Sequence, residues 1–295
     1  MGGLLVTGGG GFTGKHLCQA AINDGMVVHV LGRSVDLIDV YSHDVDIRDA
    51  SALNKAIDII DPDRVAHLAA ISHVTQGSPS AYYEVNVIGT LNLLGALARS
   101  APRIRSVLIA SSAQVYGQPD VSLIDEQVVP RPISHYGASK LAMEHLSRTF
   151  ADRLPINIVR PFNYTGAGQS TDFLVPKIVA HFAHQRTTIE LGNLDIYREM
   201  NDVSAVVAAY LKILNSGIRD EIFNICSGVG HSPRQIIAEL TKLTGHQIEV
   251  TVNPAFVRAN EQKTLVGSDA HLASVVGKLD NPKLSNTLTK MLEAA

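Results

Sequence analysis

Residues 7–14 read Thr7-Gly8-Gly9-Gly10-Gly11-Phe12-Thr13-Gly14, and this stretch decides the fold. The apolar run Leu4–Thr7 leads into it and predicts a buried strand. The amphipathic segment Gly14–Asp24 leaves it and predicts a helix. A glycine-rich turn between a strand and a helix is the context that a nucleotide-binding loop requires.

Glycines recur every three residues in this turn, at Gly8, Gly11 and Gly14. They permit a tight turn, a close approach of the backbone to a pyrophosphate, and close packing of the helix on the strand. The helix N-terminus adds unpaired amides and the positive end of its dipole. The loop, with Phe12 and Thr13, is therefore predicted to bind a dinucleotide.

Short apolar runs alternate with helix-like segments through the first two-thirds of the chain. Further strands are predicted at Val27–Leu31, Arg64–Leu68, Ser106–Ala110 and Asn157–Arg160, and further helices at Ala50–Ile60, Tyr82–Arg99 and Tyr136–Arg153. This alternation predicts an α/β fold with a doubly wound parallel sheet of the Rossmann type. The strands are apolar on consecutive residues, as expected of strands buried on both faces.

The regular alternation of predicted strands and helices ends in the last third of the chain, which suggests a second structural unit. Residues 1–162 are predicted to form the dinucleotide-binding domain, and residues 163–295 mainly a smaller C-terminal α/β substrate-binding lobe. Residues 198–226 are expected to return to the first domain, because a helix at Asp202–Asn215 and a strand at Glu221–Ile225 could extend its sheet.

Composition limits the classes of partner. The 295 residues are 45% hydrophobic and 18% charged, which is typical of a globular protein. The net charge is −3 and the basic residues are scattered, so neither a nucleic acid nor a membrane is expected as a partner. No signal peptide is expected before Leu4, and Cys18 and Cys226 lie in unrelated segments. These features predict reduced thiols and a cytoplasmic location.

The end of the second strand bears on the choice of dinucleotide. It reads Leu31-Gly32-Arg33-Ser34, with no acidic residue before Asp36. An acid at this place binds a ribose 2′-hydroxyl, whereas an arginine accommodates a 2′-phosphate. Arg33 therefore favours NADP(H), with NAD(H) possible. Asp46 and Ile47 follow at a place where an acidic and an apolar residue could contact the adenine.

Three residues form a candidate catalytic set. Tyr136 and Lys140 are four apart on a predicted helix, so that both side chains lie on one face. A free phenol has a pKa of about 10, and a neighbouring ammonium is expected to lower it. Ser112 follows the strand Ser106–Ala110 and is therefore expected at the carboxyl edge of the sheet, where such folds bind ligands. Its hydroxyl could donate to a substrate carbonyl.

Together these motifs resemble the extended short-chain dehydrogenase/reductase family over nearly the whole chain. The resemblance also covers Leu68-Ala69-Ala70, Asn86 on a helix, and Arg160-Pro161-Phe162-Asn163. It implies that Leu68, Ala69 and Ala70 line the cofactor site, that Tyr136 and Lys140 contact the cofactor, and that Asn86 helps to order the active site. It also implies a homodimer formed through the helices near Tyr82–Arg99 and Tyr136–Arg153.

The C-terminal segments resemble the GDP-sugar branch of that family. The resemblance implies that Asn163, Arg198 and Arg258 face a diphosphate, that Gly192 and Asn193 lie near the base and ribose, and that Glu261 accepts from ribose hydroxyls. The implied reaction is hydride transfer from NAD(P)H to the C4 ketone of a GDP-4-keto-6-deoxy-hexose, giving GDP-D-rhamnose.

One departure from the family pattern bears on the reaction. The 4,6-dehydratases of the family carry a glutamate where this chain has Gln114. An amide cannot take up the proton that elimination of water releases, so reduction is favoured over dehydration. Two alternatives remain open: a sugar-nucleotide 4-epimerase with tightly bound NAD, and a dinucleotide-sensing protein without catalytic activity.

No metal site is expected. His181 and His184 are three apart on a predicted helix, but no carboxylate or cysteine joins them at ligand spacing.

Overall fold

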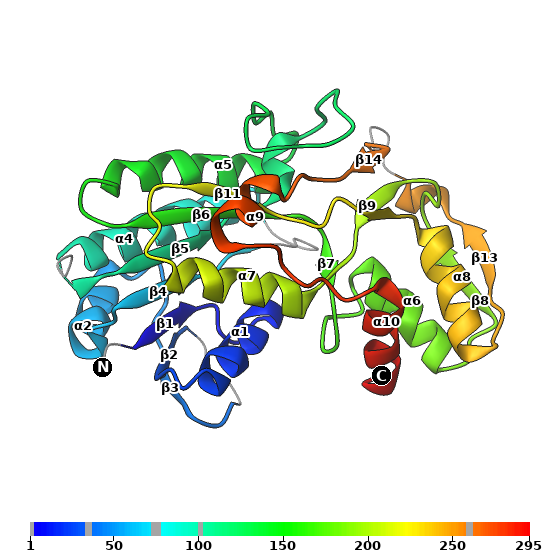
Figure 1. Ribbon diagram of the computed structural model, residues 1–295, viewed down its shortest axis with the longest axis horizontal. Helices are drawn as coiled ribbons and strands as arrows, with labels where there is room; N and C mark the ends of the chain where they lie inside the picture. Colours follow the sequence, from blue (N-terminus) through cyan, green and yellow to red (C-terminus); the bar gives the residue numbers. More distant parts are fainter. Residues whose placement is uncertain (1–2, 33–36, 72–77, 100–102, 258–261) are drawn as a thin grey trace.

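A computed structural model describes residues 3–32, 37–71, 78–99, 103–257 and 262–295. Figure 1 shows a large sheet covered by helices on both faces, with a smaller lobe beside it that ends in the C-terminal helix. The predicted α/β class and doubly wound parallel sheet are confirmed.

Seven parallel strands form the main sheet within the described residues, in the order β11-β6-β5-β4-β1-β2-β3. Their bounds are β1 Leu4–Thr7, β2 Val28–Leu31, β3 Val40–His43, β4 Arg64–His67, β5 Ser106–Ala110, β6 Ile156–Pro161 and β11 Ile222–Ile225. The order reverses between β1 and β4, and such a reversal opens a crevice at the carboxyl ends of the strands.

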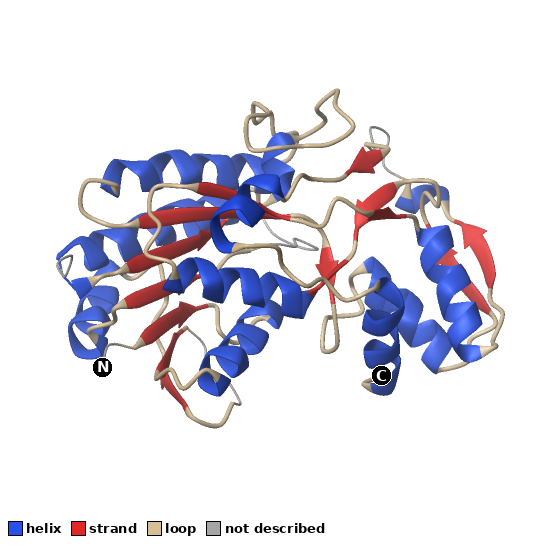
Figure 2. Ribbon diagram, viewed as in Figure 1, coloured by secondary structure: helices blue, strands red, loops and turns tan. Residues whose placement is uncertain are grey.

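Helices cover both faces of this sheet (Figure 2). One face carries α1 Phe12–Asn23 and α7 Val203–Asn215, and the other carries α2 Ala50–Ile60, α4 Thr90–Arg99 and α5 His135–Ser147. Successive strand side chains point to opposite faces. Leu4 and Val6 accordingly join the core under α1 and α7, whereas Leu5 joins the core under α2 and α4.

The segment predicted as a single helix over Tyr82–Arg99 consists of three elements. They are α3 Ser80–Tyr83, the π-helical turn η1 Glu84–Gly89, and α4. A β-carbon at Gly89 would lie 2.7 Å from Cγ2 of Ile47, so glycine is needed where η1 crosses that side chain. Single π-turns inside helices are frequent at functional sites.

The smaller lobe has its own core. Its helices are α6 Leu174–Ala183, α8 Pro233–Thr244 and α10 Leu284–Glu293, and its strand pairs are β8 Thr188–Leu191 with β13 Glu249–Val252, and β7 Tyr164–Thr165 with β10 Asn201–Asp202. A three-stranded sheet joins β9 Tyr197–Glu199 to β12 Gly230–His231 and β14 Thr264–Leu265. Helix α9 Ala270–Val276 lies back against β11.

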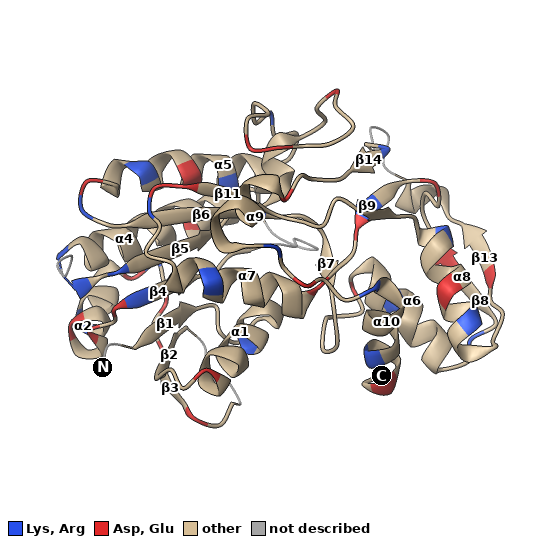
Figure 3. Cartoon of the chain, in the orientation of Figure 1, with Lys and Arg blue, Asp and Glu red and all other residues tan. Residues whose placement is uncertain are grey.

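Positively and negatively charged residues are interspersed along the chain (Figure 3). None of the helices in the described ranges combines the length and apolarity needed to cross a bilayer. Within the same ranges, no three His, Cys, Asp or Glu side chains are grouped so as to hold a metal ion.

Candidate active site

The glycine loop after β1 has the close contacts that its sequence predicts. Gly8 has φ of 72°, and a β-carbon there would lie 2.7 Å from the backbone nitrogen of Ala69. A β-carbon at Gly14 would lie 2.3 Å from the carbonyl oxygen of Gly8. The loop therefore packs against Leu68–Ala70 at the end of β4 as only glycines allow.

The N-terminus of α1 suits an anion. Gly11 is its N-cap residue and is exposed, the cap makes no side-chain hydrogen bond, and the first turn contains no acidic residue. Amides at such a helix start attract phosphate oxygens. These observations fit a dinucleotide pyrophosphate.

The three candidate catalytic side chains meet at the carboxyl end of β5. Ser112 caps the short 3-10 helix η3 Ala113–Tyr116, and its hydroxyl shares a hydrogen bond with the phenol of Tyr136. Lys140 is 3% exposed, and its Nζ donates to the carbonyl oxygen of Ala110 at 2.6 Å. Ser134 is the N-cap residue of the helix that carries both residues, and its hydroxyl accepts from the backbone nitrogen of Gly137 at 3.1 Å.

The expected effect of Lys140 on Tyr136 is wrong for this structure. Burial raises the pKa of Tyr136 to about 12, and the Ser112 hydrogen bond offsets this only in part. Burial lowers the pKa of Lys140 to about 8, opposed by the charge of Glu144. The reason is that the ammonium points to Ala110 and interacts with Glu144 in place of the phenol. The raised pKa favours the protonated phenol of Tyr136, which is the form that a proton donor requires.

A directed chain of hydrogen bonds runs from the cofactor loop through His67, which the sequence analysis did not single out. The backbone nitrogen of Ala69 donates to Oγ1 of Thr7 at 3.2 Å, which pairs with Nδ1 of His67 at 2.6 Å. Nε2 of His67 pairs with Oγ1 of Thr90 at 2.8 Å, and Thr90 donates to the carbonyl oxygen of Asn86 at 2.7 Å. Burial lowers the pKa of His67 to about 3, which favours the neutral ring. Because the Thr90 hydroxyl donates to Asn86, it accepts from His67, and this assigns the ring proton to Nε2.

Asn86 extends this series of hydrogen bonds to helix α5. Its Oδ1 accepts from the backbone nitrogen of Ile71 at 2.9 Å, and its Nδ2 donates to Oγ of Ser139 at 3.0 Å. Ser139 in turn donates to the carbonyl oxygen of Tyr136 at 2.8 Å. The π-turn η1 thus connects the cofactor loop to the residue that carries the phenol.

The residues expected to contact the adenine, Asp46 and Ile47, differ in their exposure and in their contacts. Asp46 lies at the surface, where hydrogen bonds from Arg48 lower its pKa to about 2. Ile47 is 7% exposed and packs against Gly89, so its side chain belongs to the core and only its backbone could reach an adenine. Arg33 lies outside the described residues.

Phe12 and Thr13 contact a segment that lies far along the chain. Oγ1 of Thr13 is 2.7 Å from the phenol oxygen of Tyr164, and the Phe12 ring stacks on the Tyr164 ring at 6.2 Å. Nε2 of His16 is 3.0 Å from the carbonyl oxygen of Ala167. The first turn of the cofactor helix is thereby joined to the loop that follows Asn163. The separation of 151 residues left no local signal for this contact.

Asn163 lies between β6 and β7, whereas Arg198 belongs to the three-stranded sheet of the smaller lobe. Asn163 is exposed and accepts from the backbone nitrogen of Asn201 at 3.1 Å. Arg198 lies on β9, and its Nη2 donates to the carbonyl oxygen of Gln262 at 2.6 Å. The guanidinium therefore bridges β9 and the segment that leads into β14.

The other expected substrate residues lie further into the small lobe. A β-carbon at Gly192 would lie 2.5 Å from the carbonyl oxygen of Phe256, so these two backbones touch. Oδ1 of Asn193 accepts from the backbone nitrogen of Asp195 at 3.0 Å, which shapes the turn after β8. Arg258 and Glu261 lie outside the described residues.

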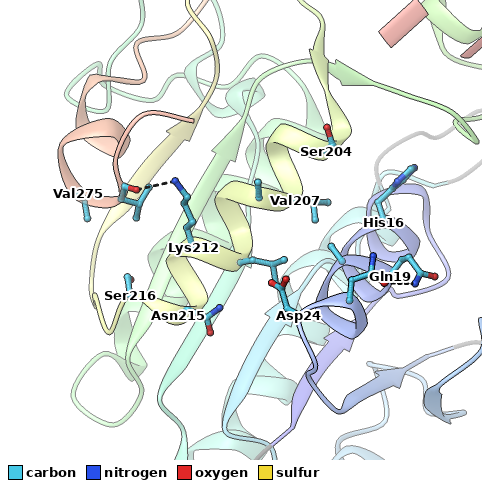
Figure 4. A pocket seen from close by; sticks show the side chains of 14 residues that line it. His16, Gln19, Asp24, Ser204, Val207, Lys212, Asn215, Ser216 and Val275 are labelled. Carbon is cyan, nitrogen blue, oxygen red and sulfur yellow. Dashed lines mark hydrogen bonds between the residues drawn. The ribbon is translucent and has the colours of Figure 1, made fainter. Parts of the chain in front are cut away.

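A groove of about 750 Å³ lies on the outer side of α1 and α7, away from these residues (Figure 4). His16, Gln19, Asp24, Lys212 and Asn215 are among its lining residues. It contains none of the residues predicted to act on a substrate or to bind a cofactor.

Comparison with known proteins gives a consistent result. The family model for GDP-mannose 4,6-dehydratase matches residues 5–277. A GDP-6-deoxy-D-talose 4-dehydrogenase from Aggregatibacter actinomycetemcomitans is 35% identical over 274 residues, which are 93% of this chain and 91% of that protein. A GDP-6-deoxy-D-mannose reductase from Pseudomonas aeruginosa is 32% identical over 285 residues, or 93% of this chain and 90% of that protein.

Solved structures match over the same extent. A proposed epimerase from Burkholderia cenocepacia J2315 has a TM-score of 0.94 and 42% identity, and covers 99% of this chain and 97% of its own. RMD from Pseudomonas aeruginosa, solved with NADPH, has a TM-score of 0.87 and 29% identity, over 100% of this chain and 98% of its own.

Proposed function

Since the chain belongs to the GDP-mannose 4,6-dehydratase family, we propose that it is an NAD(P)H-dependent reductase of the C4 ketone of a GDP-4-keto-6-deoxy-hexose. One observation carries the proposal: the Tyr136 phenol is hydrogen-bonded to Ser112, and the Lys140 ammonium lies at the same strand end. Reduction of a ketone by hydride needs a proton donor for the forming alkoxide, and a second hydrogen-bond donor can orient the carbonyl and stabilise the developing charge.

Each side chain has a role in this reaction. Ser112 donates to the carbonyl oxygen and orients it, while Tyr136 gives its phenolic proton to the forming alkoxide. Lys140 places a positive charge at the same strand end and would hold the nicotinamide ribose of the bound cofactor. The bound cofactor supplies the hydride. The protein thus contributes position and charge.

Gln114 supports reduction over elimination. It is the second residue of η3 and lies two positions after Ser112, where the family's dehydratases carry a glutamate. Its amide cannot serve as the base that removes a proton next to the ketone. The names of the two curated relatives, a dehydrogenase and a reductase of GDP-6-deoxy sugars, agree with this choice.

The proposed product is GDP-D-rhamnose, which is GDP-6-deoxy-D-mannose. The 35% identical relative is named for GDP-6-deoxy-D-talose, which differs only in configuration at C4. Both alcohols come from the same ketone, and the face that receives the hydride decides between them. The product therefore tests how the small lobe presents the sugar.

The proposed cofactor is NADP(H). Arg33 at the end of the second strand and the NADPH-bound relative from Pseudomonas aeruginosa support this preference. The ratio of kcat/KM for NADPH to that for NADH measures it. A large change of this ratio in Arg33→Ala would assign the preference to that residue.

The proposed function is tested by incubating the protein with GDP-4-keto-6-deoxy-mannose and NADPH. One NADPH should be oxidised for each sugar reduced, and proton NMR should show GDP-rhamnose by a large coupling between H3 and H4. A small coupling would identify the 6-deoxytalose product. No NADPH oxidation with this ketone would refute the reductase function.

A second candidate is a sugar-nucleotide 4-epimerase, which the 42% identical proposed epimerase favours. An epimerase regenerates its cofactor, so purified protein would carry bound NAD and consume none. Extraction of the dinucleotide after denaturation distinguishes the two functions.

We also propose that the protein is a homodimer, formed by the helical segments 82–99 and 136–153 and their symmetry mates. Ile88 and Leu146 in these segments are 50% and 37% exposed, which supports an apolar contact there. Light scattering should give twice the monomer mass, and Leu146→Glu should reduce it. A monomeric wild type would refute this arrangement.

A further inference from the structure

A third ionisable side chain continues the line of Tyr136 and Lys140 along α5. Glu144 lies one further turn along, at the same spacing of four residues, and is 2% exposed. Residues four apart share a helix face, so Glu144 is the next neighbour of the Lys140 ammonium. A buried carboxylate beside a candidate catalytic set requires an explanation.

The carboxylate of Glu144 is held from two directions. Nε and Nη2 of Arg160 donate to its two oxygens at 3.0 and 2.6 Å. Oγ of Ser111 donates to Oε1 at 2.5 Å. The side chains of the ion pair are 4% and 3% exposed, so water does not screen these charges.

The hydrogen bonds of Arg160 continue through Tyr116 to Asn224 on β11. Nη1 of Arg160 donates to the phenol oxygen of Tyr116 at 3.0 Å, and the guanidinium lies 4.9 Å from the centre of that ring. Tyr116 donates to Oδ1 of Asn224 at 2.7 Å, and the backbone nitrogen of Asn224 donates to Glu126 at 2.7 Å. Helix α5 and strands β5, β6 and β11 are thus joined by partnered buried polar groups, which makes the arrangement rigid.

We propose that Glu144 is a positioning residue of the active site, which holds the end of β5 against α5 and places a negative charge one helical turn from Lys140. This inference rests on the proposed reductase function. It adds a residue that touches neither substrate nor cofactor but acts through Ser112 and Lys140.

The positioning part follows from two consecutive residues at the end of β5. Ala110 accepts from Lys140, and Ser111 donates to Glu144. Both bonds join β5 to α5 immediately before Ser112. They therefore set how far the Ser112 hydroxyl lies from the phenol carried by α5.

The electrostatic role of Glu144 follows from the charges of the groups around Lys140. Burial favours the uncharged forms of His67 on β4 and of Tyr136 on the same helix, and Arg160 on β6 is paired with Glu144. Glu144 supplies the negative charge of this set, and its charge raises the pKa of Lys140 against the larger lowering by burial. Without it, Lys140 would lose its proton at a lower pH.

The first test is the pH profile of Glu144→Gln, measured as kcat/KM for NADPH, which reports ionisations of the free enzyme. In the wild type this quantity should fall as pH rises through about 8, where Lys140 loses its proton. In the variant the fall should move to lower pH by about one unit or more, the effect of one charge a helical turn away. We call this decline at high pH the alkaline limb of the profile. A purely structural role of Glu144 would lower kcat/KM without moving the alkaline limb.

A second variant guards against loss of folding. Glu144→Gln alone leaves the guanidinium of Arg160 buried without a carboxylate, whereas Glu144→Gln/Arg160→Gln replaces the ion pair by two amides that can hydrogen-bond. The double variant should keep most of the shift. Glu199→Gln is the matched control, because Glu199 is fully buried but lies in the small lobe, where Gly267 and Ser227 donate to it. It should leave the limb in place.

A readout without cofactor or substrate separates this inference from the proposed function. The pKa of Lys140 in the folded protein is about 8, below its usual 10.5, so its buried charge costs stability at low pH. That cost disappears as pH rises from about 8 towards 10.5. A lower pKa of Lys140 in Glu144→Gln enlarges this stability cost only below about pH 8. The gap in urea midpoint between wild type and variant should therefore shrink from pH 7 to pH 9.

The positioning part has its own variant. Ser111→Ala removes the donor to Glu144 but keeps the ion pair, so kcat should fall several-fold while the pH limb and KM for NADPH stay unchanged. The charge role would be overturned by two results together in both Glu144 variants: an alkaline limb of kcat/KM at the wild-type pH, and a difference in urea midpoint from the wild type that stays constant between pH 7 and pH 9. An unchanged kcat in Ser111→Ala would overturn the positioning role. If the wild type reduces no ketone, the proposed function fails and the urea measurement still decides the charge role.

Discussion

Gly14→Ala is the sharpest test of the cofactor loop. The added β-carbon would lie 2.3 Å from the carbonyl oxygen of Gly8 and 2.6 Å from Cα of Gly9. Both are backbone atoms, so no side-chain rotation can relieve the contact. Helix α1 has to move away from the loop by about 1 Å to restore ordinary van der Waals distances.

The magnitude follows from this contact. Overpacking in a tight interior costs about 1–3 kcal/mol. Gly95→Ala is the matched control, because its β-carbon meets nothing within 4 Å inside helix α4. There the higher helix propensity of alanine should stabilise the protein by up to about 1 kcal/mol. The two variants should therefore differ by roughly 1–4 kcal/mol, or several °C in Tm.

The assay combines thermal unfolding with NADPH titration. The chain contains no tryptophan, so the nicotinamide fluorescence is read without energy transfer from indole. Because the first-turn amides of α1 move with the helix, the Kd for NADPH should rise about tenfold or more in Gly14→Ala. A Gly14→Ala protein with the Tm of Gly95→Ala and the wild-type Kd would refute the close-packing argument.

Three further predictions concern single side chains. Tyr136→Phe should lower kcat by about 10²–10⁴-fold with the Kd for NADPH nearly unchanged, since only the proton donor is lost; wild-type turnover in stopped-flow assays would contradict the assignment. His67→Leu should destabilise the protein by about 2 kcal/mol or more in urea unfolding, because it leaves two buried hydroxyls without their partner; an unchanged urea midpoint would contradict this. Burial raises the pKa of both Cys18 and Cys226, so each thiol should react slowly with a disulfide reagent at pH 8 when native and rapidly in urea; fast native labelling would show that the burial is wrong.

Local patterns predicted the main elements where one face or both faces of an element are apolar. The strand over Ser106–Ala110 and the helix over Ala50–Ile60 have the predicted bounds, because their periodicity reflects burial directly. The strand Val40–His43 was not predicted. It lies at the sheet edge, where its side chains are half-exposed or exposed and leave no apolar run.

The candidate site shows the same division. The spacing of Tyr136 and Lys140 predicted a shared helix face. In the structure Tyr136 hydrogen-bonds to Ser112, and Lys140 donates to Ala110 at the end of β5. Glu144 lies at the same spacing, and that signal could have been used. Tyr164 could not have been found in this way, because its contact with Thr13 exists only when the two lobes meet.

The amino-acid sequence by itself determined the order of strands and helices, the glycine loop and the chemical identity of the candidate catalytic groups. These depend on neighbours a few residues away, and local periodicity and turn chemistry encode such neighbours directly. Only the tertiary structure decided the protonation states, with the phenol of Tyr136 kept as an acid and the ammonium of Lys140 facing Glu144. A pKa depends on burial and on charges brought together from distant parts of the chain, and no local pattern records that environment.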